Sequence, residues 1–585
     1  MFFLTIAMLD SDDLHGVIRR RLAQEVLVSQ ALLLIPHADA AREPRAIVWP
    51  VSWECSLFMV IALLVRCIGL TRFDLGADEG HSFLTASTSS ILDALRNDTN
   101  PPLYFVLLKS WMAAFGSSLL AMRLFSALCG SGAVGVLGAF AGRCSASRSA
   151  IRWTLALAAF NPVDLHYAQQ ARGYALATLL LSLALWSFMV AIRSNRRGAW
   201  LAHGTILALT PYTHALLAAA CAAFPIAALL MKLPRRTLRV MALTYALAAL
   251  AALPAVFLIL HQEHSSGGLA WIRPYWLATP PLLAIPRSLG LLGLGGDMPA
   301  YLLSTPPAFF TRLLAAALTL AAAFAFLQSA LHTANCERAI GVPQRIPLLL
   351  FLFVFWPLGL IWVYSLLRTP IYLVGRYDLF AQPAYLVLLG SGFAALQARF
   401  LPRFRFVIPL LVSTVLLAGL WGRYSYPLNP ALFHHEAQVE FLAAAAAPGD
   451  AIICTGLEAA PTLYHLEERH MNLPVSTFPL DTMNHIGWMI DDAAIVARRS
   501  DWTAEARAAL APSAHHGSGR VWILVDSANW TLSPIFAPSP RQQLSIDFIE
   551  TARSLGWRRV ASDAAQIQRE DALHMICLQA PDPWN

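Results

Sequence analysis

The chain has 585 residues, of which 57% are hydrophobic and only 13% are charged, and its mean hydropathy is +0.55. Soluble globular proteins carry about 25% charged residues, so this composition excludes a disordered chain and argues against a protein that is soluble throughout. The net charge is +7, but the basic clusters at 193–197 and 232–239 lie between long apolar runs. That placement is typical of cytoplasmic loops of a membrane protein and argues against a nucleic-acid partner.

Residues 1–48 are predicted to form a cytoplasmic N-terminal tail. Three arginines at 19–21 and an apolar patch at 31–35 resemble a signal peptide. The patch is shorter than the apolar core that a signal peptide needs, so we do not expect cleavage. A start codon assigned too early is the alternative explanation for this tail.

Residues 49–422 are predicted to form a transmembrane domain of about eleven helices, since one span needs about 20 apolar residues. The candidate spans lie at 50–70, 119–141, 152–170, 173–192, 200–214, 215–231, 239–260, 306–331, 346–367, 378–397 and 405–422. The apolar segment 101–116 is short and contains Lys109. If it lies along the membrane surface, the basic loops face the cytoplasm, and the loops at 71–118 and 261–305 face outward.

Residues 423–585 are predicted to form a soluble extracytoplasmic α/β domain, because about 160 residues can bury a core of their own. The runs at 451–455 and 521–526 have strand character, and helical patterns lie at 434–446 and 541–555. Cys454 and Cys577 both fall in this region. In an oxidising compartment they could form a disulfide, although their spacing does not decide it.

The predicted outward loop 71–118 contains FDLGADEGHS, with Asp74, Asp78, Glu79 and His81. A solvated loop is the ordinary interpretation of such a run. The functional interpretation is a carboxylate at the membrane–water boundary, where loss of hydration makes it a better general base.

Two further polar clusters lie at outward span ends. Arg172 and Tyr174 stand in QQARGY, and Arg376 precedes Tyr377. An arginine at a span end often extends toward lipid headgroups, but a guanidinium also binds phosphate oxygens in a bidentate manner. His214 has the same two readings, structural or functional. His261 and His264 have helical spacing but no clear third metal ligand.

The ordered set of these motifs resembles the lipid-linked-sugar glycosyltransferases of the GT-C superfamily. It is most similar to the branch with protein O-mannosyltransferases and the bacterial aminoarabinose transferase of lipid A, and so is glycosyltransferase family 39-like. The resemblance covers about residues 50–400, and its motifs are Asp78-Glu79, PPLYFVLLKSWMAAFG at 101–116, RLFS at 123–126, ARGYAL at 171–176, PYTH at 211–214, WIRP at 271–274 and Arg376-Tyr377.

The resemblance implies a polyprenyl-phosphate sugar donor bound from the membrane side and an acceptor from the aqueous side. It implies that Asp78 is the catalytic base, with Glu79 supporting it or helping to hold a cation. The residues implied for the lipid phosphate are Arg172, Tyr174, Arg376 and Tyr377, and those for acceptor or substrate contacts are His81, His214 and Trp271. Some relatives carry a second acid where this chain has YAQQARG, so the metal site is unknown and a divalent cation stays open.

The predicted function is therefore inverting sugar transfer to an acceptor hydroxyl on the extracytoplasmic face of a plasma membrane, by implication a bacterial inner membrane. The acceptor is a glycan, a lipid or a protein. A lipid or glycan transporter is the alternative, because polar residues inside spans often mark a transport path. Here the polar features gather on one face and no inverted repeat is visible, which favours chemistry at the surface.

Overall fold

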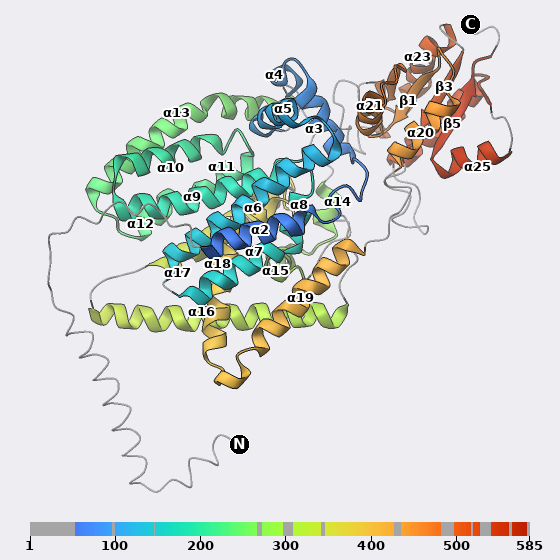
Figure 1. The fold of residues 1–585 in the computed structure, drawn as a ribbon. Helices are drawn as coiled ribbons and strands as arrows, with labels where there is room; N and C mark the ends of the chain where they lie inside the picture. The colour runs from blue at the N-terminus through green and yellow to red at the C-terminus, as the bar shows by residue number, and fades with distance from the viewer. Residues whose placement is uncertain are drawn as a thin grey trace, which may run out of the picture. The chain divides into compact units, whose positions relative to one another are not determined.

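The computed structural model describes residues 53–581, apart from the stretches 96–99, 146, 266–271, 297–307, 341–344, 426–433, 481–495, 516–518, 527–539 and 561–563. The predicted N-terminal tail, 1–48, lies outside the described residues. The described chain begins with helices and ends with a small sheet and its covering helices (Figure 1).

The helical part runs from α2 to α19. Its helices are α2 (Trp53–Cys67), α3 (Ala77–Ser87), α4 (Ile91–Leu95), α5 (Leu103–Phe115), α6 (Leu119–Cys144), α7 (Arg148–Phe160), α8 (Pro162–Ala168), α9 (Tyr174–Ser194), α10 (Arg197–Leu209), α11 (Ala215–Cys221), α12 (Ala223–Leu230), α13 (Arg235–Ser265), α14 (Arg273–Leu277), α15 (Pro281–Leu294), α16 (Phe309–Ile340), α17 (Ile346–Leu367), the 3-10 helix η4 (Tyr377–Ala381), α18 (Gln382–Ala398), η5 (Pro402–Phe404) and α19 (Val407–Tyr424).

Seven stretches within the described residues are helical, long and apolar enough to cross a membrane, so the protein is a multi-pass membrane protein. They contain α6, α9, α13, α16, α17, α18 and α19. The other four predicted spans coincide with shorter helices, namely α2, α7 with α8, α10, and α11 with α12. The segment predicted to lie along the membrane contains α5, whose 13 residues measure about 20 Å and fall short of a hydrocarbon core of about 30 Å.

The predicted span at 152–170 is broken into α7 and α8 by Asn161 and Pro162. The Asn161 side chain accepts hydrogen bonds from the amides of Val163 and Asp164, so it caps α8, and Pro162 occupies the first turn. The side-chain amide nitrogen of Asn161 donates to the carbonyls of Leu292 and Gly293 at the end of α15. After this break α8 leads into residues 169–173, where the amide of Ala171 donates to Glu79 of α3.

The C-terminal domain contains a five-stranded mixed sheet of order β2-β1-β3-β5-β4. The strands are β1 (Ala451–Thr455), β2 (Val475–Phe478), β3 (Arg520–Leu524), β4 (Arg558–Arg559) and β5 (Met575–Gln579). β1 is parallel to β2 and β3, while β5 is antiparallel to β3 and β4. The predicted α/β domain and its strands at 451–455 and 521–526 are confirmed.

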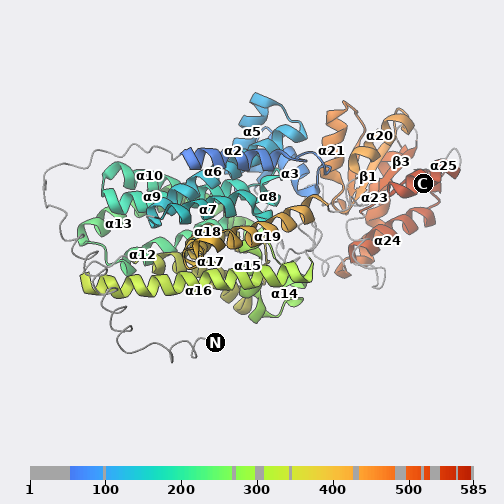
Figure 2. The ribbon, with the colours of Figure 1, turned by 60° about the horizontal axis from the view of Figure 1, so that its bottom comes forward.

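Helices cover both faces of this sheet. Alternate residues of β1 face opposite sides, so Ile452 packs with α20 (His435–Ala445) and α21 (Ala459–Glu468), and Ile453 with α23 (Trp502–His515) and α24 (Pro540–Ser554). The remaining elements are η8 (Arg499–Asp501) and α25 (Ala564–Ala572) (Figure 2). Helices α20 and α24 match the helical patterns predicted at 434–446 and 541–555.

Cys454 and Cys577 are both free and buried. They lie on β1 and β5, with β3 between them. Two strand spacings of about 4.8 Å place their Cα atoms about 10 Å apart, beyond the span of a disulfide. The disulfide considered from the sequence is therefore not formed.

Candidate functional site

Asp78 lies in the first turn of α3 and faces two arginines from distant parts of the chain. Its carboxylate oxygens are 3.4 Å from the Arg376 guanidinium and 4.0 Å from that of Arg172. Arg172 also donates to the main-chain carbonyl of Asp78, at 3.1 Å, and to the Asn100 side chain, at 3.3 Å. The Asp78 side chain is 50% exposed, so the loss of hydration expected from the sequence is absent, and its setting is instead strongly cationic.

A turn at Gly375 places Arg376 in this site. Gly375 precedes it with φ +85°, a backbone conformation that favours glycine. The Gly375 carbonyl accepts a hydrogen bond from the Tyr167 hydroxyl at 2.7 Å, and its amide donates to Asp378 at 2.8 Å. Tyr167 and Asp378 therefore fix the turn from both sides.

Tyr174 fixes the direction of the Arg376 side chain. The Arg376 Nε donates to the Tyr174 hydroxyl at 2.6 Å, and its guanidinium lies 5.4 Å from the centre of that ring. It also lies 5.8 Å from the Tyr377 ring. His214 packs 5.8 Å from Tyr377, and its Nδ1 accepts from the Leu216 amide to cap α11. The structure thus gathers Arg172, Tyr174, Arg376, Tyr377 and His214 around Asp78.

Glu79 points away from this group and into the protein. Its two oxygens accept hydrogen bonds from Arg123 at 2.8 and 2.6 Å, and the amide of Ala171 donates to it at 2.8 Å. Arg123 also donates to the carbonyls of Leu70, Phe73 and Asp74. The acidic pair therefore separates into an accessible carboxylate and a buried one that ties α3 to α6 and to the loop before α3.

The remaining predicted acceptor or substrate contacts are His81 and Trp271. The His81 ring packs edge-on against Phe105 of α5, at 5.9 Å. Trp271 lies outside the described residues.

The described side chains do not fit a divalent cation. Among them, no group of three or more His, Cys, Asp or Glu residues could hold a metal ion. Both oxygens of Glu79 are engaged by Arg123, and Asp78 faces guanidinium groups that repel a cation.

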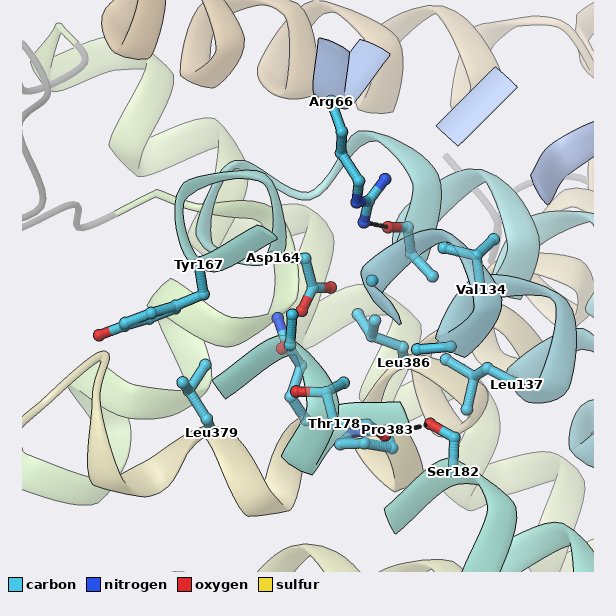
Figure 3. Close-up of a pocket in the computed structure, with 15 residues that line it drawn as sticks. Arg66, Val134, Leu137, Asp164, Tyr167, Thr178, Ser182, Leu379, Pro383 and Leu386 are labelled. Atoms are coloured by element: carbon cyan, nitrogen blue, oxygen red, sulfur yellow. Dashed lines mark hydrogen bonds between the residues drawn. The ribbon is translucent and has the colours of Figure 1, made fainter. Parts of the chain in front are cut away.

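A small cavity lies inside the bundle between α2, α6, α8, α9 and α18 (Figure 3). Figure 3 shows Arg66 and Asp164 projecting toward it, with Thr178 and Ser182 on another side. Its volume of about 20 Å³ has room for about one water molecule, so it is too small for a sugar or a phosphate. It therefore belongs to the packing beneath the site rather than to substrate binding.

Sequence reasoning missed two features that support the site. The RLFS motif was recognised, but nothing in the sequence paired Arg123 with Glu79. Asp74 was recognised as one of the loop acids, yet its partner His465 lies 391 residues away, in the C-terminal domain. A pair at that separation leaves no local signal in the chain.

Comparison with known protein families finds a match in the helical part of the chain. Residues 99–260 match the family described as Dolichyl-phosphate-mannose-protein mannosyltransferase. The match lies in the helical part and covers less than half of the chain. The match confirms the predicted resemblance and the predicted enzyme class, a membrane glycosyltransferase that uses a lipid-phosphate sugar donor. The matched segment includes Arg172, Tyr174 and His214, whereas Asp78 and Arg376 lie outside it.

Solved structures show the same fold. The chain resembles ArnT from Cupriavidus metallidurans in the apo state, with a TM-score of 0.54 and 13% identity over 91% of this chain and 98% of ArnT. The structure of the same protein bound to undecaprenyl phosphate gives a TM-score of 0.51 and 14% identity, with the same coverage. No curated protein sequence matches the chain significantly. The fold extends across the helices and the C-terminal domain alike, well beyond the family segment.

Proposed function

We propose that this glycosyltransferase moves a sugar from a polyprenyl phosphate to an acceptor hydroxyl on the extracytoplasmic face of a bacterial inner membrane. One observation carries the proposal: the accessible Asp78 carboxylate lies beside the guanidinium groups of Arg172 and Arg376. This arrangement combines a proton acceptor with positive charge for a leaving phosphate. An acceptor from water and a donor from the bilayer would meet at this end of the bundle.

Arg172 and Arg376 are the proposed ligands of the donor phosphate. Guanidinium groups bind phosphate oxygens through charge-assisted hydrogen bonds. The Tyr174 hydroxyl and the Tyr377 ring hold Arg376 in one orientation before the donor arrives. A protein of similar fold, ArnT, has been solved with undecaprenyl phosphate, which supports a donor of this class.

The proposed reaction is a single displacement with inversion. The acceptor oxygen attacks the anomeric carbon, and the bond from that carbon to the phosphate oxygen breaks. Its electron pair stays on the phosphate, and Asp78 takes the proton from the acceptor hydroxyl. Arg172 and Arg376 stabilise the charge that develops on the phosphate, where oriented charge contributes most.

Glu79 is proposed to act by position. Its buried pair with Arg123 anchors the first turn of α3, so the direction of the Asp78 side chain is set by a neighbour that does not touch substrate. The ring of His214 packs against Tyr377 at the edge of the proposed donor-phosphate site. His81 and Trp271 stay proposed acceptor contacts.

The test compares the wild-type protein with Asp78→Asn, each purified in nanodiscs. Each is incubated with radiolabelled polyprenyl-phosphate hexoses and pentoses and with a membrane extract as the acceptor source. We expect the wild type to consume one donor and the variant to be slower by about 10²–10⁴-fold, the contribution of a general base. Asp93→Asn is the matched control, since Asp93 is an exposed acid of α4 in the same outward loop.

Wild-type turnover by Asp78→Asn would contradict the assignment of the base. The transporter alternative predicts a different result, in which labelled donor crosses a sealed vesicle intact and no sugar is released. Release of the sugar to the extract therefore distinguishes the two functions.

A further inference from the structure

Helix α21 of the C-terminal domain packs directly on α3, and the two lie side by side in Figures 1 and 2. Gly80 of α3 meets the main chain at the start of α21. A Cβ at this position would lie 2.7 Å from the carbonyl carbon of Ala460 and 2.8 Å from the nitrogen of Pro461. One turn further, the rings of Phe83 and Tyr464 meet edge to face at 4.9 Å. Only glycine at position 80 permits this approach.

A second contact joins the C-terminal domain to the loop that leads into α3. The Asp74 carboxylate lies 2.7 Å from His465 Nε2 of α21 and accepts a hydrogen bond of 2.9 Å from the amide of Glu436 in α20. Both side chains of the Asp74–His465 pair are buried, with exposures of 7% and 3%. The Asp74 carbonyl accepts from Arg123 on the other side. This segment is therefore held by the C-terminal domain and the helical bundle together, four residues before Asp78.

Other charged groups surround this contact. His435 of α20 lies 3.9 Å from Asp74 through its Nδ1 and 2.8 Å from Glu458 through its Nε2. The Nδ1 of His465 lies 3.1 Å from Glu468. Imidazoles and carboxylates thus alternate from Glu468 to Glu458, and Asp74 is the one member that belongs to the helical domain.

We propose that the C-terminal domain positions the helix that bears the base, and that His465 is the positioning residue. The inference rests on the proposed role of Asp78. Arg172 and Arg376 also contact Asp78, but each has an anchor outside α3, since Arg172 bonds Asn100 and Arg376 bonds Tyr174 within the helical domain. Loosening α21 should therefore displace the base and leave donor binding nearly intact.

The experiment measures kcat and the donor KM of His465→Ala, using the polyprenyl-phosphate sugar that the wild type consumes. A displacement of about 1 Å can slow a reaction about 10²-fold, so we expect kcat to fall about 10- to 100-fold while the donor KM changes less than about threefold. His465→Gln keeps an N–H donor near the position of Nε2 and should recover at least about tenfold of the lost kcat. Thermal unfolding checks that each variant is folded.

Gly80→Ala tests the same idea without altering His465. The added methyl must push α21 away from α3, so the same fall in kcat is expected. Gly359→Ala is the matched control, because a Cβ at that glycine within α17 meets nothing within 4 Å.

Each outcome bears on the inference. A normal kcat in His465→Ala or Gly80→Ala overturns it, as does a raised donor KM with an unchanged kcat. Failure of His465→Gln to recover activity overturns the assignment of His465. If the wild type consumes no donor, or if Asp78→Asn is fully active, it is the proposed function that fails, and that result is separable from the behaviour of His465.

Discussion

Replacing Glu79 by glutamine should destabilise the folded protein by about 3 kcal/mol or more, because it leaves a buried guanidinium without its counter-charge. Arg123 and Glu79 have exposures of only 4% and 7%, and they meet at 2.6 Å. Removing one partner of such a pair costs about 3–5 kcal/mol, since the remaining charge has lost both water and its partner. Glutamine retains one acceptor oxygen, which favours the lower end of this range.

The assay is unfolding in detergent micelles by increasing denaturant, followed by the fluorescence of the 17 tryptophans. The double variant Glu79→Gln/Arg123→Met should lose less stability than the two single variants summed, because it removes both charges together. Glu440→Gln is the control, because Glu440 is an exposed acid of α20.

Asp78→Asn provides the decisive contrast. Its side chain is half exposed, so we expect its unfolding free energy to stay within about 1 kcal/mol of the wild type while its activity is lost. A Glu79→Gln protein within about 1 kcal/mol of the wild type would refute the structural role of the buried pair.

Four further predictions concern the donor, two residues of the domain contact and the helix break. Arg172→Ala should raise the donor KM more than the acceptor KM when each substrate is varied in turn; an effect confined to the acceptor would contradict its phosphate role. Burial alone would raise the pKa of Asp74, but its hydrogen bond from His465 and the charges of His465 and His435 lower it to about 2, whereas the ordinary value is about 3.9. The resulting stabilisation of the folded protein, about 2 kcal/mol, is present above pH 4 and is lost as the pH falls toward 2. The difference in unfolding free energy between wild type and Asp74→Asn, measured with denaturant, should therefore narrow over that interval. A difference that does not depend on pH would contradict this prediction. Burial would lower the pKa of His435, but Glu458 raises it, so this contribution is complete below about pH 6.5 and is lost as pH rises past the folded pKa; His435→Gln should therefore differ most from the wild type at acidic pH. Asn161→Ala should cost about 0.5–2 kcal/mol in the same unfolding assay, because α8 loses its N-cap, and an unchanged midpoint would be inconsistent with that role.

Part of the site could be recognised in the sequence because its motifs are short and ordered along the chain. Asp78, Arg172, Tyr174, Arg376, Tyr377 and His214 were all named from such motifs, and the fold brings them together. Their roles depend on partners far along the chain. The two acids of the Asp-Glu pair are adjacent in sequence, yet one faces water and arginines and the other is buried against Arg123.

The sequence by itself determined the membrane character, the positions of the long spans and the α/β nature of the last domain. These properties follow from hydropathy and periodicity, which are local and survive in one dimension. Only the tertiary structure decided that Asn161 and Pro162 divide a predicted span, that β3 separates Cys454 from Cys577, and that His465 reaches Asp74. Each of these depends on which surfaces pack together, and packing is settled by the whole fold rather than by any segment of the chain.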